Sequence, residues 1–192
     1  NLRVVSGGDK LSVSLASKIM SSCRELWNLY GPTETSVSSL FHKVKEKDIN
    51  NDEIPICKPI ENTLVIVADS MQNPVAKHEA GELLIGGPRV AKGYIDSALT
   101  SEKFINLPYM NGERFYRTGD LVRWNEDGEL LFIGRNDSQI KIRGYRIEIG
   151  EIEKAIASIE GVIEAVVVAD SDRGDKLAAL IRADNGITET FV

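Results

Sequence analysis

The sequence of 192 residues is poor in cysteine and has no long apolar run, and each of these absences excludes a class of protein. The spacing of its two cysteines, Cys23 and Cys57, fits neither a disulfide framework nor a metal site. We interpret both cysteines as buried or half-buried thiols. No run approaches the roughly 20 apolar residues that span a bilayer, and no leader peptide is recognisable. We therefore expect no membrane contact and a reducing, cytoplasmic setting.

The chain also lacks an excess of positive charge. A net charge of -6 and a pI near 5.1 argue against a nucleic-acid surface, which requires a cationic field. Local basic groups still allow a small anionic ligand to bind. The run "SGGDK" at residues 6–10 lacks the spacing of a phosphate loop. The pattern shows no partner for His42 or His78, and we expect both at the surface.

Residues 1–44 predict the edge of a parallel α/β sheet. A short apolar strand at residues 2–5 is followed by a helix capped by Ser12 and by a second strand at residues 25–30. This β-α-β order implies a parallel pair whose ligands gather beyond the carboxyl ends of the strands. The apolar face of the helix is predicted to consist of Leu15, Ala16, Ile19 and Met20. Because the sequence opens directly on a strand pattern, we expect it to be a fragment of a larger domain.

Residues 45–136 predict a β-rich, barrel-like part, and residues 137–192 a small α+β unit. Short strands broken by turns are expected at 63–69, 81–87, 114–124 and 128–135. After Asp137 come a strand pair at 138–149, a helix at 150–159 that Gly161 ends, and two more strands at 162–170 and 176–184. The predicted fold class is therefore a multi-subdomain combination of α/β and α+β, with residues 1–136 as one domain and 137–192 as a truncated second one.

The run "NLYGPTE" at residues 28–34 is too polar for a core. Gly31 and Pro32 signal a turn that brings the ring of Tyr30 close to the hydroxyl of Thr33 and the carboxylate of Glu34. Such a trio can stack on a base, bond a phosphate and hold a divalent cation. A surface turn in which Thr33 only caps a following helix explains the same residues.

Two further segments carry polar groups in turns. In "YRTGDLVRW", Asp120 leaves a Thr-Gly turn and enters an apolar strand, where its carboxylate can accept hydrogen bonds from a vicinal diol such as ribose. An Asx-type turn that bonds only neighbouring N–H groups is the alternative. In "GRNDSQIKIRGYRIEIGEIE", Arg135 follows a strand, and a local cationic cluster comes after it. The alternative interpretation of this cluster is a solvated strand face. This cluster consists of Lys141, Arg143 and Arg146.

Four segments in this order resemble the adenylate-forming enzyme superfamily, most closely the adenylation domains of nonribosomal peptide synthetases. They are "NLYGPTE", "GELLIGGPRVAKGY", "YRTGDL" and "GRNDSQIKIRGYRIEIGEIE", and they cover the chain up to about Ala169. The family activates a carboxylic acid with Mg-ATP to an acyl adenylate and releases pyrophosphate. It then passes the acyl group to the phosphopantetheine thiol of a carrier domain. The resemblance implies ATP and Mg²⁺ as cofactors, an amino acid substrate, and a peptidyl carrier domain and neighbouring synthetase domains as partners.

The resemblance also implies roles for single residues around the nucleotide. Tyr30 would stack on adenine, with Asn28 along the same pocket. Thr33 would contact the α-phosphate, and Glu34 would hold Mg²⁺. The ribose hydroxyls would bond Asp120.

Four further implications concern the sugar, the second domain and the substrate. Arg135 would support the ribose, Asp137 matches the hinge of a small C-terminal lid, and Lys141 matches a lid lysine of the thioester-forming orientation. The amino acid pocket would be lined in part by Val5, Gly7, Leu29, Val37 and Ser38. Because these residues carry no charge, we expect a small or medium, neutral side chain in the substrate.

The chain departs from the family in what it does not contain. The family's phosphate loop, the aspartate that pairs with the substrate amine and the terminal Gly-Lys motif are not found, so we expect residues 1–192 alone to be inactive. An acyl- or aryl-CoA ligase of the same superfamily is one alternative, although Pro32 and "QIKIRGYRIE" favour the synthetase type. A nucleotide-binding module without turnover is the other.

Overall fold

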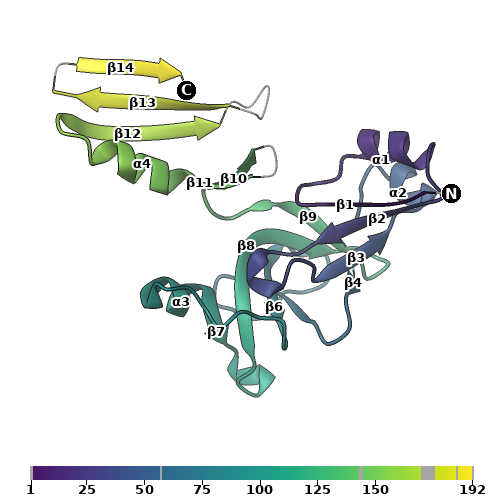
Figure 1. Cartoon of the computed structure of the whole chain (residues 1–192). Coiled ribbons are helices and arrows are strands. Elements are labelled where there is room, and N and C mark those ends of the chain that lie inside the picture. The colour runs from purple at the N-terminus through teal and green to yellow at the C-terminus, as the bar shows by residue number, and fades with distance from the viewer. Residues whose placement is uncertain (1, 57, 143–144, 170–175, 185, 192) are drawn as a thin grey trace. The chain divides into compact units, whose positions relative to one another are not determined.

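The computed structural model describes residues 2–56, 58–142, 145–169, 176–184 and 186–191. The chain forms two compact units, Asn1–Asn136 and Asp137–Val192, each with its own internal packing (Figure 1). None of the helices within these ranges is long and apolar enough to cross a membrane. The architecture combines mixed sheets with few helices, and the predicted fold class is confirmed.

The first unit begins with a four-stranded sheet in the order β1-β2-β3-β4 (Figure 1). The predicted parallel pair is confirmed, since β1 runs parallel to β2, while β3 and β4 continue the sheet antiparallel. Its elements are β1 (Arg3–Gly7), α1 (Val13–Met20), β2 (Glu25–Tyr30), the 3₁₀ turn η1 (Thr33–Thr35), β3 (Leu40–Lys43), α2 (Glu46–Asn50) and β4 (Lys58–Pro59).

One face of this sheet is covered by α1 and α2. The predicted cap is confirmed, because the Ser12 hydroxyl accepts the Leu15 N–H at 3.3 Å. The predicted apolar face is wrong at Leu15, which is 48% exposed, whereas Val13 packs against the core. The half-buried thiol of Cys23 lies against the same core, and Cys57 lies outside the described residues.

A second sheet of five strands follows, in the order β5-β6-β8-β7 with β9 on β8. Its long central strand β8 pairs with β6, β7 and β9, so all three depend on its register. Among the described residues these pairings leave the sheet open, whereas a barrel-like form was expected. The elements are β5 (Leu64–Ala68), β6 (Gly81–Gly86), α3 (Ser97–Lys103), β7 (Phe104–Asn106), the 3₁₀ turn η2 (Pro108–Met110), β8 (Arg114–Trp124) and β9 (Leu130–Arg135).

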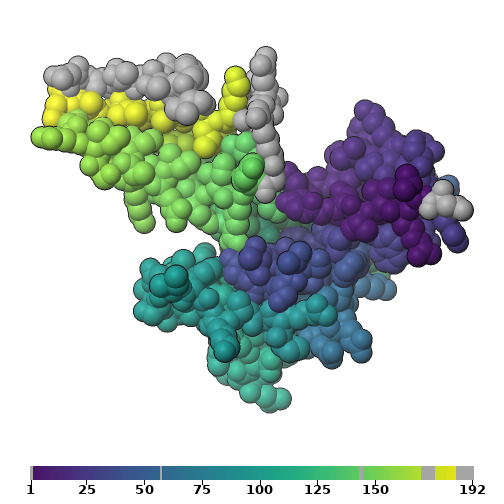
Figure 2. Space-filling view, viewed as in Figure 1, coloured from purple at the N-terminus to yellow at the C-terminus, as the bar shows by residue number. Residues whose placement is uncertain are grey.

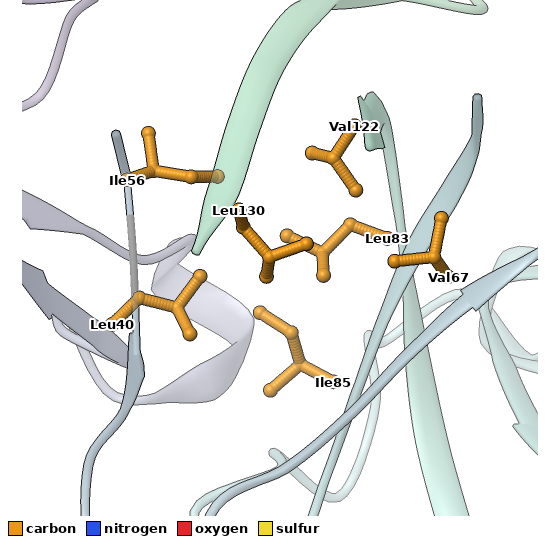
Figure 3. Packing of buried hydrophobic residues seen from close by; sticks show 7 residues of the cluster. All are labelled: Leu40, Ile56, Val67, Leu83, Ile85, Val122 and Leu130. Atoms are coloured by element: carbon orange, nitrogen blue, oxygen red, sulfur yellow. The ribbon is translucent and has the colours of Figure 1, made fainter. Parts of the chain in front are cut away.

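The two sheets share one hydrophobic cluster. Leu40 of β3 and Ile56 pack against side chains of β5, β6, β8 and β9, and Figure 3 shows these side chains pointing toward one another around Leu130. Because Leu40, Leu83 and Leu130 are fully buried, residues 1–44 and 45–136 are joined through this cluster. By contrast, α3 has no buried residue and lies at the surface in Figure 2 (teal).

The second unit contains a strand pair and a helix that packs on a three-stranded sheet. The helix α4 contacts β12, and the Glu153 carboxylate accepts the N–H of Val167 at 2.9 Å. The prediction that Gly161 ends this helix is wrong, because the helix already stops at Ala157. Gly161 has a φ of 85° and lies in the turn that leads into β12. The elements are β10 (Gln139–Ile142), β11 (Tyr145–Glu148), α4 (Ile149–Ala157), β12 (Val162–Ala169), β13 (Leu177–Ala183) and β14 (Gly186–Phe191).

The shared cluster predicts that Leu130→Ala destabilises the first unit by about 2–5 kcal/mol, because the substitution leaves a cavity between the two sheets. Both tryptophans of the chain, Trp27 and Trp124, lie in this unit, so their fluorescence in a denaturant titration reports its unfolding. The control is Ile133→Ala on the same strand, where the side chain is 46% exposed. Equal effects of the two substitutions would contradict this packing.

Candidate functional site

Three strands bring Tyr30, Asp120 and Arg135 together. Tyr30 is the last residue of β2, Arg135 is the last residue of β9, and Asp120 lies opposite Arg135 on β8. The Arg135 guanidinium donates through Nη1 to Asp120 Oδ1 at 2.6 Å, and the Tyr30 hydroxyl donates to Asp120 Oδ2. Tyr30 and Asp120, to which the resemblance gave roles around one nucleotide, are therefore in direct contact through a hydrogen bond.

A bulge in β8 sets the direction of Asp120. Gly119 has a φ of 73°, which favours glycine, and its N–H donates to the Glu82 carboxylate at 3.0 Å. The Thr118 hydroxyl donates to the carbonyl of Leu83 at 2.7 Å and accepts the N–H of Asp120 at 3.0 Å. Asp120 thus lies inside a continuous strand, and its predicted place at a strand start is wrong.

The three side chains form a charged group that is largely shielded from water. The Asp120 and Arg135 side chains are 9% and 15% exposed, so their ion pair is screened little by solvent. Burial, and after it the Asp120 carboxylate, holds the pKa of the Tyr30 phenol well above its ordinary value. Tyr30 therefore remains a neutral donor at physiological pH, and the carboxylate has one charged and one neutral partner.

The turn after Tyr30 requires glycine at its first position because the backbone packs closely there. A Cβ on Gly31 would lie 2.7 Å from the Ser39 nitrogen and the Val37 oxygen, so close approach, not an unusual φ, requires glycine here. Pro32 is the N-cap residue of η1, and no side chain caps the turn, so the alternative role of Thr33 as a cap does not apply. Thr33 is exposed at the first position of the turn.

Glu34 is buried within the same turn and is held by a tyrosine that the sequence did not single out. Tyr94 donates its hydroxyl to Glu34 Oε1 at 2.6 Å, and Ala91 donates its N–H to the Glu34 carbonyl at 2.8 Å. The described residues contain no group of three or more His, Cys, Asp or Glu side chains arranged for a metal. The Glu34 carboxylate beside the exposed Thr33 hydroxyl fits a Mg²⁺ ion that binds together with phosphates, because the phosphates then supply most of the oxygen ligands.

The AMP-binding enzyme family model matches residues 1–95. The chain is 45% identical over its full length to bacitracin synthase 3 of Bacillus licheniformis, of which it covers 3%. A solved nonribosomal peptide synthetase (NRPS) protein containing adenylation and carrier (PCP) domains matches with a TM-score of 0.82 at 34% identity, over 95% of this chain and 38% of that one. The chain belongs to the adenylate-forming superfamily.

Within that superfamily, the solved structures that match include further nonribosomal peptide synthetases. A four-domain synthetase solved with AMP and glycine matches at 40% identity and a TM-score of 0.66, over 95% of this chain and 14% of that one. The chain spans only a small part of the curated relatives, for example 5% of tyrocidine synthase 2 from Brevibacillus parabrevis, to which it is 43% identical over 97% of its own length. The four segments that carried the resemblance therefore identify the family correctly.

Two residues near the adenylation motifs have structural partners. The buried Asn28 amide donates to the carbonyl of Pro55 at 2.9 Å, which ties β2 to the connection before β4. The prediction that His42 lies at the surface is wrong. His42 is buried, and its Nε2 lies 2.7 Å from Asp48 Oδ2. On the sheet His42 lies opposite the buried Asn28, a pairing of β2 with β3 that only the fold reveals. His78 is exposed, as expected.

The predicted amino acid pocket falls into two groups. Val5, Gly7 and Leu29 share one sheet face, since Gly7 pairs with Leu29 and Val5 with Trp27 in the parallel register. Val37, which is 78% exposed with a φ of 70°, lies in the turn after η1 with Ser38. A pocket lined by all five residues stays a prediction.

The remaining predicted residues belong to the second unit. Asp137 is its first residue, and the Asp137 carboxylate accepts the N–H of Gln139 at 3.2 Å. Lys141 is exposed on β10 and pairs with Arg146 on β11, so two cations of the predicted cluster are neighbours. Arg143 lies outside the described residues. The hinge and lid roles stay predictions.

The raised pKa of Tyr30 predicts how stability changes at alkaline pH. In the unfolded chain the phenol ionises near pH 10, whereas in the folded unit it stays protonated, so stability is complete below pH 10 and falls as pH rises further. Tyr30→Phe should remove up to about 1.4 kcal/mol of this loss per pH unit. Unfolding titrations between pH 8 and about 11.5 measure the slope. Tyr145→Phe, at a tyrosine that is 75% exposed, should leave it unchanged, and equal slopes for wild type and Tyr30→Phe would refute the assignment.

Proposed function

We propose that the chain is the nucleotide-binding part of an enzyme that activates an amino acid with ATP. The amino acid carboxylate attacks the α-phosphate of ATP and pyrophosphate leaves. The phosphopantetheine thiol of a carrier domain then attacks the carbonyl of the adenylate, the thiol loses its proton, AMP leaves, and an aminoacyl thioester forms. The proposal depends most on the Asp120 carboxylate, which Tyr30 and Arg135 hold at the end of β2, beside the turn that presents Thr33 and Glu34.

The nucleotide roles follow from the chemistry of these groups. A fixed carboxylate accepts hydrogen bonds from two ribose hydroxyls without first reorganising, and the Arg135 guanidinium fixes that carboxylate through an ion pair. The ring of Tyr30 would stack on adenine while its hydroxyl bonds Asp120. Asn28, whose amide is bonded to Pro55, would act by fixing β2 beside this pocket.

The phosphate roles fall to the turn η1. The exposed hydroxyl of Thr33 would donate to an α-phosphate oxygen, where negative charge builds during attack. The carboxylate of Glu34 would hold Mg²⁺, which when bound with ATP neutralises part of the phosphate charge. Because Glu34 is buried and receives the Tyr94 hydroxyl, its carboxylate would not need to be ordered when the nucleotide binds.

The substrate and partner assignments extend this proposal. An amino acid with a neutral side chain fits the uncharged positions Val5, Gly7 and Leu29. In the second unit, Asp137 would act as the hinge between half-reactions, and Lys141 would act in the thioester-forming orientation. Support for a carrier partner comes from the relatives, one of which contains adenylation and PCP domains. A cytoplasmic location remains part of this proposal.

Two alternatives predict different activities. A CoA ligase would also catalyse exchange of pyrophosphate into ATP, but it would transfer the acyl group to free coenzyme A and not to a carrier domain. A nucleotide-binding module would bind ATP without exchange. Amino-acid-dependent exchange, followed by loading of a carrier domain, therefore decides among the three. We expect both steps in the complete adenylation domain that contains this sequence, and no exchange by residues 1–192 alone.

The ribose assignment predicts that Asp120→Asn in the complete adenylation domain raises the KM for ATP by about 10- to 100-fold, because charge-assisted hydrogen bonds are replaced by weaker ones. The KM for the amino acid should change little. Steady-state exchange measurements with ATP and amino acid varied separately provide both values. Asp127→Asn, at an exposed carboxylate paired with Lys47, is the control. A folded Asp120→Asn enzyme with the wild-type KM for ATP would remove Asp120 from the ribose site.

The hinge assignment predicts unequal effects of Asp137→Pro on the two half-reactions. Proline fixes φ at the first residue of the second unit and should trap one orientation. We expect adenylation or carrier loading to fall by about tenfold or more while the other step is retained, as measured by exchange and by loading of a carrier domain. Ser138→Ala is the neighbouring control. Small, equal effects on both steps would place the pivot elsewhere.

A further inference from the structure

The segment 87–94, called here the Tyr94 strap, contacts the turn η1 at three points. The Ser36 hydroxyl donates to the Arg89 carbonyl at 3.0 Å, and the Ala91 N–H donates to the Glu34 carbonyl at 2.8 Å. The third point is the Tyr94 hydroxyl, which donates to Glu34 Oε1 at 2.6 Å. The strap therefore bonds both the backbone and the side chain of Glu34.

The ring of Tyr94 is itself fixed by neighbouring groups. Its edge lies against Phe104, with ring centroids 5.3 Å apart, and its hydroxyl lies 3.3 Å from that of Tyr116. Its N–H donates to the Thr100 hydroxyl at 2.8 Å. Burial, and next the hydrogen bond to Glu34, holds the pKa of the Tyr94 phenol well above its ordinary value. The phenol is therefore a permanent donor at physiological pH.

Arg114 also holds the strap. Its Nη1 and Nη2 donate to the carbonyls of Ala91 and Lys92 at 3.0 and 2.7 Å, and its guanidinium lies 4.6 Å from the centroid of the Phe104 ring. Within the strap, a Cβ on Gly93 would lie 2.5 Å from Thr100, so the backbone packs against α3 without space for a side chain. These contacts place the Tyr94 hydroxyl in a defined position.

We propose that Tyr94 is a positioning residue that orients the Glu34 carboxylate toward a divalent cation bound with ATP. A hydrogen bond to one oxygen fixes the rotation of the carboxylate, and a partner of this kind commonly decides how well a carboxylate serves as a metal ligand. The inference rests on the proposed function, because that function assigns Glu34 to the cation. The inference adds Tyr94, which lies outside the "YGPTE" motif and 60 positions from Glu34 in the sequence.

The direct test measures cation binding without turnover. Mn²⁺ is titrated into the complete adenylation domain with ATP and no amino acid, and free Mn²⁺ is followed by electron paramagnetic resonance. Tyr94→Phe keeps the ring and removes the hydroxyl, and it should weaken Mn²⁺ binding by about 10-fold. The control is Tyr109→Phe, which removes an exposed tyrosine hydroxyl that donates to the carbonyl of Gln72, and it should bind Mn²⁺ like the wild type. Wild-type Mn²⁺ affinity in folded Tyr94→Phe would overturn the proposal, as would an equal loss in both variants.

A second pair of measurements separates this inference from the proposed function. When Glu34→Gln is already present, Tyr94→Phe should no longer change the Mn²⁺ affinity, because the effect passes through that carboxylate. If Glu34→Gln leaves Mn²⁺ binding unchanged, the metal role of Glu34 fails, and the inference fails with it. If Glu34→Gln weakens binding while Tyr94→Phe does not, only the inference fails. Should Tyr94→Phe not fold, 4-fluorophenylalanine at position 94 fills the space of the hydroxyl without donating a hydrogen bond and should likewise weaken Mn²⁺ binding, and wild-type Mn²⁺ affinity in that protein would overturn the proposal.

Discussion

Both oxygens of the Asp120 carboxylate are bonded by partners from other strands, Tyr30 from β2 and Arg135 from β9. A carboxylate buried to this degree is costly unless it is paired, and removal of one partner of a buried ion pair commonly costs about 3–5 kcal/mol. The native arrangement therefore requires β2, β8 and β9 to be in register at the same time. The same requirement places the turn η1, which follows Tyr30 directly, beside the bulge that carries Asp120.

The site gains its order from neighbours that carry out no chemistry themselves. Glu82 accepts the N–H of Gly119 and also bonds Arg117 at 2.7 Å, so the bulge before Asp120 is held by a buried carboxylate on β6. Tyr94 holds Glu34 in a similar way, through a hydrogen bond from its hydroxyl. In both cases a polar group is satisfied before any ligand arrives, and groups ordered in advance bind a ligand with a smaller loss of conformational entropy.

Local pattern was sufficient for the strands whose signal is contained in their own residues. The alternation and turns around 81–86, 114–124 and 130–135 predicted β6, β8 and β9 nearly at their bounds. The two-residue β4 was missed, because so short a strand owes its form to pairing with β3. The His42–Asp48 pair and the Tyr94–Glu34 hydrogen bond were missed for a related reason, since no local pattern shows which polar groups meet after folding. The family was recognisable because its motifs are themselves local.

We propose that the Asp120 carboxylate, which Tyr30 and Arg135 hold, receives the ribose hydroxyls of ATP. Calorimetric titration of ATP and of 2′,3′-dideoxy-ATP into the wild-type complete domain and its Asp120→Asn variant tests it most directly. We expect removal of the two hydroxyls to weaken binding by about 10-fold or more in the wild type, and by far less in Asp120→Asn, because the carboxylate that accepts their hydrogen bonds is gone. The same penalty in both proteins would show that the ribose binds elsewhere and would contradict the account.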